Sequence, residues 1–336
     1  MQKGLVSLLT SCYNTGHLIH RLLDSVLAQT YPNIEMFVID DGSTDNSEQI
    51  IKSYISRFEE KGYSLSYYYQ ENSGIPAAIK TGLQLINGDY LAWPDSDDFY
   101  ASPDSIAKMV DKLANATSEF AMVRTMQRFV DENTLEELYV VGQKAKEEES
   151  LNLFEDCLFV RNGFYFGAGA YMLRVSTLKE VTNFDIYTDR DAGQNWQLFL
   201  PILYTYKCLT IKEILYNILL RKLSHGRGGY AGYEKLTLRV KAYERTLLET
   251  LERIKTLPNE RRLYYKQLVA AKYCKERMNL AYDYKQNDEF IKEYNILCIQ
   301  IPTNLRAIDR LRYYAIKTKF DFLLRFFLRI YHKITK

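Results

Sequence analysis

The sequence predicts an α/β fold in which helices flank a mostly parallel, Rossmann-like central sheet, followed by a helical C-terminal region. Short apolar runs alternate with helical segments over residues 1–110, which is the pattern of strands joined by crossover helices. Polar clusters follow three of the predicted strands directly. Because ligands bind at the carboxyl ends of parallel strands, these clusters indicate a single site at that edge of the sheet.

The predicted elements alternate regularly in the N-terminal part of the chain. The strands, each a short apolar run, are 5–9, 34–39, 65–69 and 90–93. The helices are 17–29, a segment that runs from the polar residues 40–45 to about 58, and 75–85. The three polar clusters are 10–14, 40–41 and 95–98.

The pattern becomes less regular after Asp104. Helices are expected at 147–159 and 196–206, and 164–173 is rich in glycine and aromatic residues. Residues 223–230 have the composition of a flexible loop. From about Tyr233 onward, the sequence predicts charged, tyrosine-rich helices with a break at Pro302.

The composition excludes several classes of protein. With 47% hydrophobic and 26% charged residues, the 336-residue chain can bury a sizeable core, and its net charge of +2 argues against a nucleic-acid-binding protein. The five cysteines form no C-x-x-C pair, so we expect a reducing cytoplasm and neither a disulfide framework nor a zinc site. We find no signal-peptide core and no apolar run long enough to cross a bilayer, so a soluble or peripheral protein is expected.

The C-terminal end is basic and amphipathic. From Arg306 onward, nine Lys or Arg stand against Asp309 and Asp321, a local net charge of +7 that leaves −5 for the rest of the chain. One helical stripe, with Arg325 and Arg329 off it, comprises Phe320, Leu323, Leu324, Phe327, Leu328 and Tyr331. Such a helix either lies on an anionic membrane surface or packs on the protein or in an oligomer, so 306–336 is a candidate membrane contact.

The strongest single motif is the acidic run Asp95-Ser96-Asp97-Asp98 after the fourth predicted strand. Clustered carboxylates repel one another unless a cation compensates them, and oxygen ligands of this kind suit Mg²⁺ or Mn²⁺. The alternative role is a helix N-cap, which fits Asp104 better. Asp40 and Asp41 either cap the helix that follows them or accept a hydrogen bond from a nucleobase.

Residues 1–110 resemble glycosyltransferase family 2, the inverting class with the GT-A fold. The stretches that match in order and spacing are 10–14, 25–32, 34–45, 71–74, 87–91 and 95–98. The resemblance implies that Tyr13 stacks on the base of a nucleotide-sugar donor and that Asp40 or Asp41 reads that base. Thr10 and Asn72, within the matching stretches, are further candidate donor contacts.

The same resemblance implies a metal-assisted reaction. Asp95 and Asp97 would hold the ribose and metal region, and Asp98 is the expected direct ligand of Mn²⁺ or Mg²⁺. His225, in the glycine-rich loop, would complete the metal shell or touch the diphosphate, and its alternative role is that of a solvated loop residue. The cation would neutralise the departing diphosphate as a Lewis acid.

Two departures from the family pattern stand out. Where relatives often have Ala-Arg-Asn, this chain has Ala78-Ile79-Lys80, so Lys80 is the candidate replacement for the arginine, although the two side chains are not equivalent. Where relatives place a Glu-Asp pair before an aromatic, this chain has Gln194-Asn195-Trp196, and an amide is too weakly basic to deprotonate an acceptor.

We therefore expect Asp191 to be the candidate catalytic base, one helical turn before Asn195. The alternative is that Asp191 is a helix N-cap that forms a capping box with Gln194, and Asp189 is a looser candidate for the base. Gln194, Asn195 and Trp196 are candidate acceptor contacts. The aromatic residues of 162–171 either stack on an acceptor sugar or fill the core.

The predicted organisation is a GT-A domain over 1–225, with a donor half (1–110) and an acceptor half (111–225), followed by a helical region over 226–336. The expected reaction transfers a hexose with inversion, from a UDP-sugar in preference to a GDP- or dTDP-sugar, to a glycan or lipid-linked acceptor. The expected location is the cytoplasm, at the inner face of the membrane. The oligomeric state is left open.

The sequence argues against one rival function and leaves a second one open. A nucleotidyltransferase would need a glycine-rich, basic phosphate loop after the first strand, and residues 10–16 contain one glycine and no Lys or Arg. A non-catalytic nucleotide- or glycan-binding relative is supported by the Gln194-Asn195 replacement.

Overall fold

The structure is a computed structural model of the 336-residue chain, and it describes residues 4–143, 153–221, 232–300 and 305–334. The chain divides into two compact units, the first formed by Met1–Arg227 with Arg245–Asn259 and the second by Gly228–Glu244 with Glu260–Lys336. The predicted boundary after residue 225 falls beside the first of these breaks. The second half of helix α9 (Tyr233–Arg253) nevertheless belongs to the first unit, which sequence periodicity could not show.

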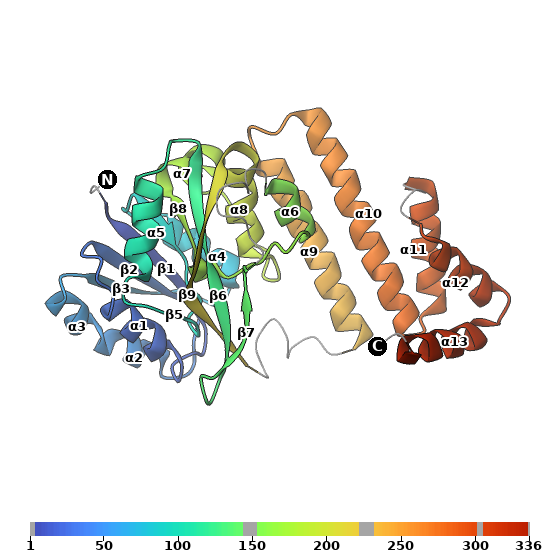
Figure 1. The fold of residues 1–336 in the computed structure, drawn as a ribbon, viewed down its shortest axis with the longest axis horizontal. Coiled ribbons are helices and arrows are strands. Elements are labelled where there is room, and N and C mark those ends of the chain that lie inside the picture. Colours follow the sequence, from blue (N-terminus) through green and yellow to red (C-terminus); the bar gives the residue numbers. More distant parts are fainter. Residues whose placement is uncertain (1–3, 144–152, 222–231, 301–304, 335–336) are drawn as a thin grey trace. The chain divides into compact units, whose positions relative to one another are not determined.

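The first unit is built on one mixed sheet (Figure 1). In the described part of the chain it contains β1 (Val6–Cys12), β2 (Ile34–Asp40), β3 (Ser64–Tyr69), β4 (Tyr90–Ala92), β5 (Phe99–Tyr100), β6 (Phe120–Asp131), β7 (Glu137–Val141), β8 (Tyr171–Arg174) and β9 (Lys207–Leu220). The strand order is β3-β2-β1-β4-β8-β6-β9-β5, with β7 paired to β6. Pairing is parallel from β3 to β4 and antiparallel where β8 joins β4 and β6.

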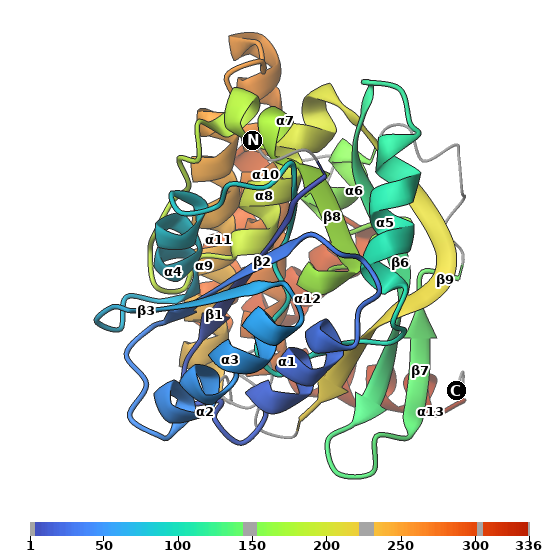
Figure 2. The same ribbon diagram turned by 90° about the vertical axis from the view of Figure 1, so that its left-hand side faces the viewer.

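The donor half follows the predicted alternation of strands and helices. Strand β2 is buried along its whole length and β1 nearly so, as expected for parallel strands that are covered on both faces. The helices are α1 (Ile19–Leu27), α2 (Ser47–Ser53), α3 (Ile55–Glu60), α4 (Ile75–Leu83) and α5 (Ser105–Ala114). Helices α1 to α3 lie next to one another beside the sheet (Figure 2), and α4 packs against β1 and β2. The single helix predicted up to residue 58 is in fact two, broken at Tyr54.

The acceptor half adds α6 (Phe154–Phe159), the 3-10 turn η1 (Ala168–Ala170), α7 (Val175–Thr182) and α8 (Gln194–Thr205). The predicted helix at 196–206 is confirmed as α8, which begins two residues earlier. Of the predicted helix at 147–159, residues 147–152 lie outside the described part, and the remainder is helical over 154–159. The glycine- and aromatic-rich segment 164–173 contributes η1 and most of β8.

The second unit is helical, as predicted. It comprises the first half of α9 with α10 (Asn259–Asp283), α11 (Asn287–Gln300), α12 (Ala307–Lys317) and α13 (Asp321–Ile334). Its core is formed by Met278, Phe290, Leu297 and the side chains packed around them. Fully buried Asp309 stabilises the start of α12, because its carboxylate accepts the Arg306 backbone N–H at 2.8 Å and pairs with Lys275. Among the described residues, no helix is long and apolar enough to cross a membrane.

Candidate active site

The loops that follow β1, β2 and β4 are joined by hydrogen bonds. The Thr15 hydroxyl donates to Ser96 Oγ at 3.0 Å, which links the β1 loop to the acidic loop after β4. The Asn14 backbone N–H donates to Ser43 Oγ at 2.9 Å, and its side-chain oxygen accepts the Thr44 N–H at 2.8 Å. The structure therefore brings the three predicted polar clusters together at one edge of the sheet.

A fourth loop, between β3 and α4, is held against the β2 loop. Gly42 has a φ of +82°, and a Cβ at this position would stand 2.8 Å from the Asn72 nitrogen. A side chain at Gly42 would therefore be strained by its backbone conformation and would push Asn72 away. This close approach explains why glycine follows the two aspartates, and it places Asn72 at the site.

Asp40 and Asp41 are both buried, and both carboxylates accept hydrogen bonds from other groups of the protein. Asp40 accepts the Ser43 backbone N–H and the Tyr67 hydroxyl, each at 2.8 Å. Burial and the neighbouring Asp40 raise the pKa of Tyr67, so the phenol keeps the proton that it donates.

Asp41 organises the fourth loop. Its carboxylate accepts the backbone N–H groups of Ser73 at 2.9 Å and Gly74 at 2.8 Å, and the Gln70 side-chain amide at 2.7 Å. Both aspartates thus shape the loops around the site. Recognition of a nucleobase by either one stays a prediction.

Thr10 and Tyr13, both predicted to contact the donor, differ in accessibility. Thr10 is fully buried, and its hydroxyl donates to the Pro94 carbonyl at 3.0 Å. The structure therefore gives Thr10 a positioning role beneath the acidic loop, in place of the predicted direct contact. Tyr13 is 45% exposed, which leaves its ring open to stacking.

The acidic cluster comprises Asp95, Asp97 and Asp98. Asp98 is buried, and its Oδ1 accepts the Leu219 backbone N–H from β9 at 2.8 Å. Asp97 pairs with Arg221 at 2.5 Å, and both side chains are mostly buried. Burial and repulsion from Asp97 raise the pKa of Asp95 to about 7 and the pKa of Asp98 well above its ordinary value.

The cluster is suited to a cation that is shared with a ligand. The described residues include no group of three or more acidic, His or Cys side chains arranged to hold a metal by themselves, and the predicted third ligand, His225, lies outside the described residues. However, three carboxylates share one guanidinium, so an added cation would relieve their repulsion. Mg²⁺ and Mn²⁺ commonly use one or two carboxylates and complete their shell with phosphates and water.

An arginine that the sequence analysis missed lies at the fourth loop. The Arg190 guanidinium donates to the Asn72 carbonyl at 2.8 Å and contacts the Asn72 side-chain oxygen. Its backbone packs against Gly74, where a Cβ would be 2.9 Å from the Arg190 Cα. Because Arg190 follows Asn72 by 118 residues, no local pattern indicates the contact.

Lys80, by contrast, is engaged away from this contact. Its ammonium pairs with Asp185 at 2.8 Å, and Arg253 lies 3.6 Å from the same carboxylate. Lys80, the candidate replacement for the family arginine, is thus held in an ion pair in this structure, and its contact with a donor stays a prediction. Arg190 is the guanidinium that the fold brings to the fourth loop, at Asn72.

The start of α8 reaches the acidic loop through a side-chain contact. Trp93, buried just before Pro94, donates its indole N–H to Asn195 Oδ1 at 2.9 Å. An indole nitrogen can only donate, so the amide oxygen of Asn195 must face Trp93 and the NH₂ group is left for another acceptor. Gln194 beside it is half-buried.

Trp196 does not line an acceptor surface as predicted. It is buried, its indole N–H donates to the Cys157 carbonyl at 3.1 Å, and its ring meets Phe166 edge-on at 5.3 Å. The aromatic residues of 162–171 behave similarly: Phe164, Tyr165 and Tyr171 are buried. The structure therefore favours the core-filling alternative for these side chains.

Asp191 precedes α8 and is exposed, whereas the N-cap of the helix is Gly193, with no side-chain capping bond. The predicted placement on a helical turn and the alternative capping box with Gln194 are therefore both wrong. Asp189 is occupied by the Tyr187 hydroxyl at 3.0 Å and by Arg245 at 3.1 Å. Among the described residues, no hydrogen bond or ion pair engages the Asp191 carboxylate, which makes it the more available acid.

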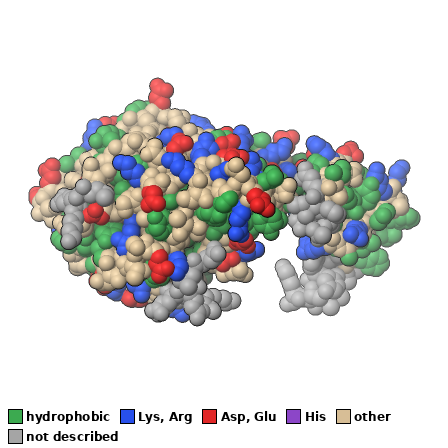
Figure 3. Space-filling view, turned by 90° about the horizontal axis from the view of Figure 1, so that it is seen from above, with side chains coloured by type: hydrophobic (Ala, Val, Ile, Leu, Met, Phe, Trp, Pro, Cys, Tyr) green, Lys and Arg blue, Asp and Glu red, His purple; other side chains and the backbone are tan. Residues whose placement is uncertain are grey.

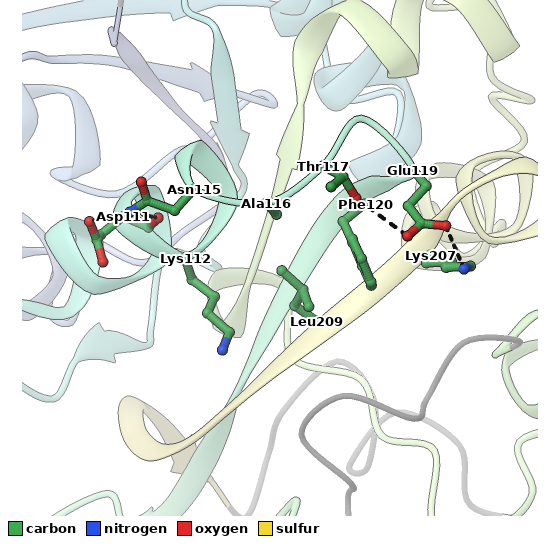
Figure 4. Close-up of a pocket in the computed structure, with 9 residues that line it drawn as sticks. All are labelled: Asp111, Lys112, Asn115, Ala116, Thr117, Glu119, Phe120, Lys207 and Leu209. Carbon is green, nitrogen blue, oxygen red and sulfur yellow. Dashed lines mark hydrogen bonds and ion pairs between the residues drawn. The ribbon is translucent and has the colours of Figure 1, made fainter.

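The hollow shown in Figure 4 is separate from this site. It measures about 550 Å³ and is lined by residues from the end of α5 and the starts of β6 and β9. The Lys207–Glu119 ion pair, at 2.5 Å, borders it. Since Asp98 binds the opposite end of β9, at Leu219, the hollow adds nothing to the acidic cluster.

A mixed sheet whose parallel strands end at an acidic cluster places the protein in the α/β class, in which ligands bind at the carboxyl ends of the parallel strands. Within that class, the family model described as glycosyl transferase family 2 matches residues 7–181, more than half of the chain. The chain therefore belongs to glycosyl transferase family 2.

Relatives match part of their own length. Glycosyltransferase GlyA of Streptococcus pneumoniae is 28% identical over 227 residues, which are 66% of this chain and 31% of GlyA. An uncharacterized glycosyltransferase of Rickettsia typhi is 31% identical over 149 residues, 44% of each protein. The matched region thus spans less than half the length of these relatives.

Solved structures confirm the predicted GT-A fold. S. aureus TarS 1–349 in complex with UDP-GlcNAc has a TM-score of 0.60 at 15% identity, covering 94% of this chain and 88% of that one. The mannosyltransferase PcManGT of Pyrobaculum calidifontis, in complex with GDP-Man and Mn²⁺, has a TM-score of 0.53 at 16% identity, covering 93% and 84%.

Proposed function

We propose that the chain transfers a hexose from a nucleotide sugar, preferably a UDP-sugar, to a glycan or lipid-linked acceptor with inversion and with the help of a divalent cation. The observation that carries this proposal is the buried acidic cluster beneath the joined strand-end loops. Membership of the family supports it. The complexes of TarS with UDP-GlcNAc and of PcManGT with GDP-Man and Mn²⁺ support a nucleotide-sugar donor and a divalent cation.

Within this proposal, each donor contact has a distinct task. Tyr13 stacks on the base, and Asp40 and Asp41 keep the surrounding loops in place and read the base edge. Asn72 and Arg190 bind the ribose and diphosphate, since a guanidinium fork matches phosphate oxygens. Asp97 and Asp98, with Asp95 beside them, hold Mg²⁺ or Mn²⁺, which when bound stabilises the charge that develops on the diphosphate.

The acceptor side completes the reaction. The acceptor hydroxyl attacks the anomeric carbon from the face opposite the diphosphate, and the bond to the diphosphate breaks with inversion. Asp191 takes the proton of the hydroxyl, and the amides of Gln194 and Asn195 orient the acceptor. His225 is proposed to touch the cation or the diphosphate.

A second function is favoured by one specific observation. The family resemblance puts Asn195 at the position of a carboxylate, and its side-chain oxygen accepts the Trp93 indole N–H at 2.9 Å. A relative that binds a nucleotide or glycan without transfer would keep this arrangement. Metal-dependent hydrolysis of the donor that disappears in Asp98→Ala would exclude the non-catalytic function.

The proposal is tested by calorimetric binding of UDP, GDP and dTDP, each with Mn²⁺ and with EDTA. We expect one nucleotide, UDP, to bind with Mn²⁺ and to lose its affinity in EDTA. Binding of GDP or dTDP alone would change the donor class and leave the metal role intact. Binding of no nucleotide under either condition would overturn the proposed donor site.

Arg190 is expected to contribute to donor affinity. Arg190→Ala should raise the Kd of the preferred nucleotide about tenfold, because a charge-assisted hydrogen bond is worth about 1.5 kcal/mol or more. Arg190→Lys should restore little, since an ammonium lacks the fork geometry. Arg161→Ala, which removes an exposed arginine paired with Glu155, is the matched control. If Arg190→Ala and Arg190→Lys bound the nucleotide with the same Kd as Arg161→Ala, the role of Arg190 in donor binding would be refuted.

A further inference from the structure

The described half of α13 exposes an apolar face. Phe322, Phe326 and Phe327 are 66%, 58% and 63% exposed, and Leu323 is exposed beside them. The spacing i, i+1, i+4 and i+5 puts the four side chains on one side of the helix. Within the second unit, no described residue covers this face.

This face differs from the predicted stripe. Leu324, which belonged to the stripe, is half-buried, whereas Phe322 and Phe326, which did not, are exposed. Arg325, expected on the polar side, faces inward: its guanidinium lies 3.8 Å from the Tyr282 ring centroid and pairs with Asp321 at 2.5 Å. The cation–π contact and the hydrogen bond from Arg325 to the Tyr282 carbonyl set the rotation of the helix and turn the phenylalanines outward.

Helix α12, which contacts α13, extends the apolar surface. Leu311 and Tyr314 on α12 and Phe320 in the connection are exposed. Figure 3 shows hydrophobic and basic side chains together over the C-terminal helices. Exposed apolar side chains gathered on neighbouring elements mark an interaction surface, unlike scattered single ones.

The charges on this surface have one sign. Over 305–327, both acids are turned inward: Asp309 is fully buried with Lys275, and Asp321 is mostly buried with Arg325. The exposed charged residues of this described range are Arg306, Arg310, Lys317 and Lys319. The surface therefore combines aromatic side chains with uncompensated positive charge.

We propose that this surface, formed by α12 and the exposed face of α13, binds an anionic lipid bilayer. Anionic headgroups compensate the lysines and arginines, and the phenylalanines enter the boundary with the acyl chains. A second copy of the chain would bring two cationic surfaces together, which disfavours self-association through this face. Binding to lipid requires neither nucleotide nor metal, so it is independent of the proposed transferase activity.

The test is co-sedimentation of the full chain with phosphatidylcholine vesicles that contain either no anionic lipid or about one third phosphatidylserine. We expect binding to the anionic vesicles alone, and weaker binding as salt is raised. Phe322→Ser combined with Phe326→Ser and Phe327→Ser should reduce the partition coefficient more than tenfold. Leu238→Ser with Leu263→Ser, which alters side chains of 62% and 60% exposure elsewhere in the second unit, should leave it unchanged.

A charge variant separates lipid binding from a folding defect. Lys317→Glu with Lys319→Glu should lower the partition coefficient about tenfold. Each basic residue near an anionic surface adds to the electrostatic attraction, and these substitutions reverse two of the four exposed positive charges. Lys285→Glu with Lys292→Glu is the matched control. Equal binding by all variants, no binding by the intact chain, or a dimer in sedimentation velocity that the phenylalanine variant dissolves would each overturn the proposal.

Discussion

Asp97→Asn is expected to lower kcat/KM for donor turnover about a thousandfold, which corresponds to roughly 4 kcal/mol of transition-state stabilisation. Asp97 is the acid of the cluster that forms an ion pair with Arg221. Because Arg221 is a cation, a bound metal ion can take its place beside the Asp97 carboxylate. The amide keeps the shape of the side chain but removes the charge that would hold the cation. Metal-dependent hydrolysis of the preferred nucleotide sugar measures the effect.

A structural defect would give a different pattern. Asp104→Asn changes a partly exposed acid at the N-cap of α5, where it pairs with Lys108 at 2.9 Å. It should leave hydrolysis unchanged and lower the melting temperature by a few degrees at most. Asp97→Asn should melt within a few degrees of the wild type, while its nucleotide affinity loses the response to EDTA. Wild-type hydrolysis by Asp97→Asn would remove Asp97 from the metal site.

Asp191→Asn is expected to reduce transfer about 10²- to 10⁴-fold, the usual contribution of a positioned general base. Nucleotide affinity should not change, because the side chain is assigned to the acceptor and not to the donor. Asp191 is exposed, and the structure gives its carboxylate no competing partner among the described residues. Single-turnover measurements with saturating donor isolate this step from binding.

Asp189→Asn provides the comparison. It removes the acceptor of the Tyr187 hydroxyl and the partner of Arg245, so we expect a lower melting temperature and a smaller change in rate. Full activity of Asp191→Asn would refute its role as the base. If Asp189→Asn alone lost activity while remaining folded, the base would be reassigned to Asp189.

Much of the donor half could be predicted from local patterns. The apolar runs at 5–9 and 34–39 became β1 and β2, and the polar residues after them meet at one edge, because parallel strands all end on the same side of a sheet. The same rule predicted that the acidic cluster after β4 lies at this edge of the sheet. Helix boundaries could not be predicted in the same way, because apolar spacing does not record the break at Tyr54.

The partners of individual side chains could not be predicted in this way. Trp93 reaches Asn195 across 102 residues, and Arg190 reaches Asn72 across 118. Lys80, a reasonable choice from its position after the fourth loop, instead pairs with Asp185. In α13, the contact of Arg325 with Tyr282 rotated the helix relative to the predicted stripe.

The sequence by itself therefore determined the family, the order of strands and helices in the donor half, and the loops that form the site. Tertiary structure alone decided that Thr10 and Trp196 are buried, that Arg190 supplies the guanidinium, and which face of α13 is exposed. The physical reason is that periodicity reports which side of an element is apolar, whereas a hydrogen bond or ion pair depends on which distant element packs beside it.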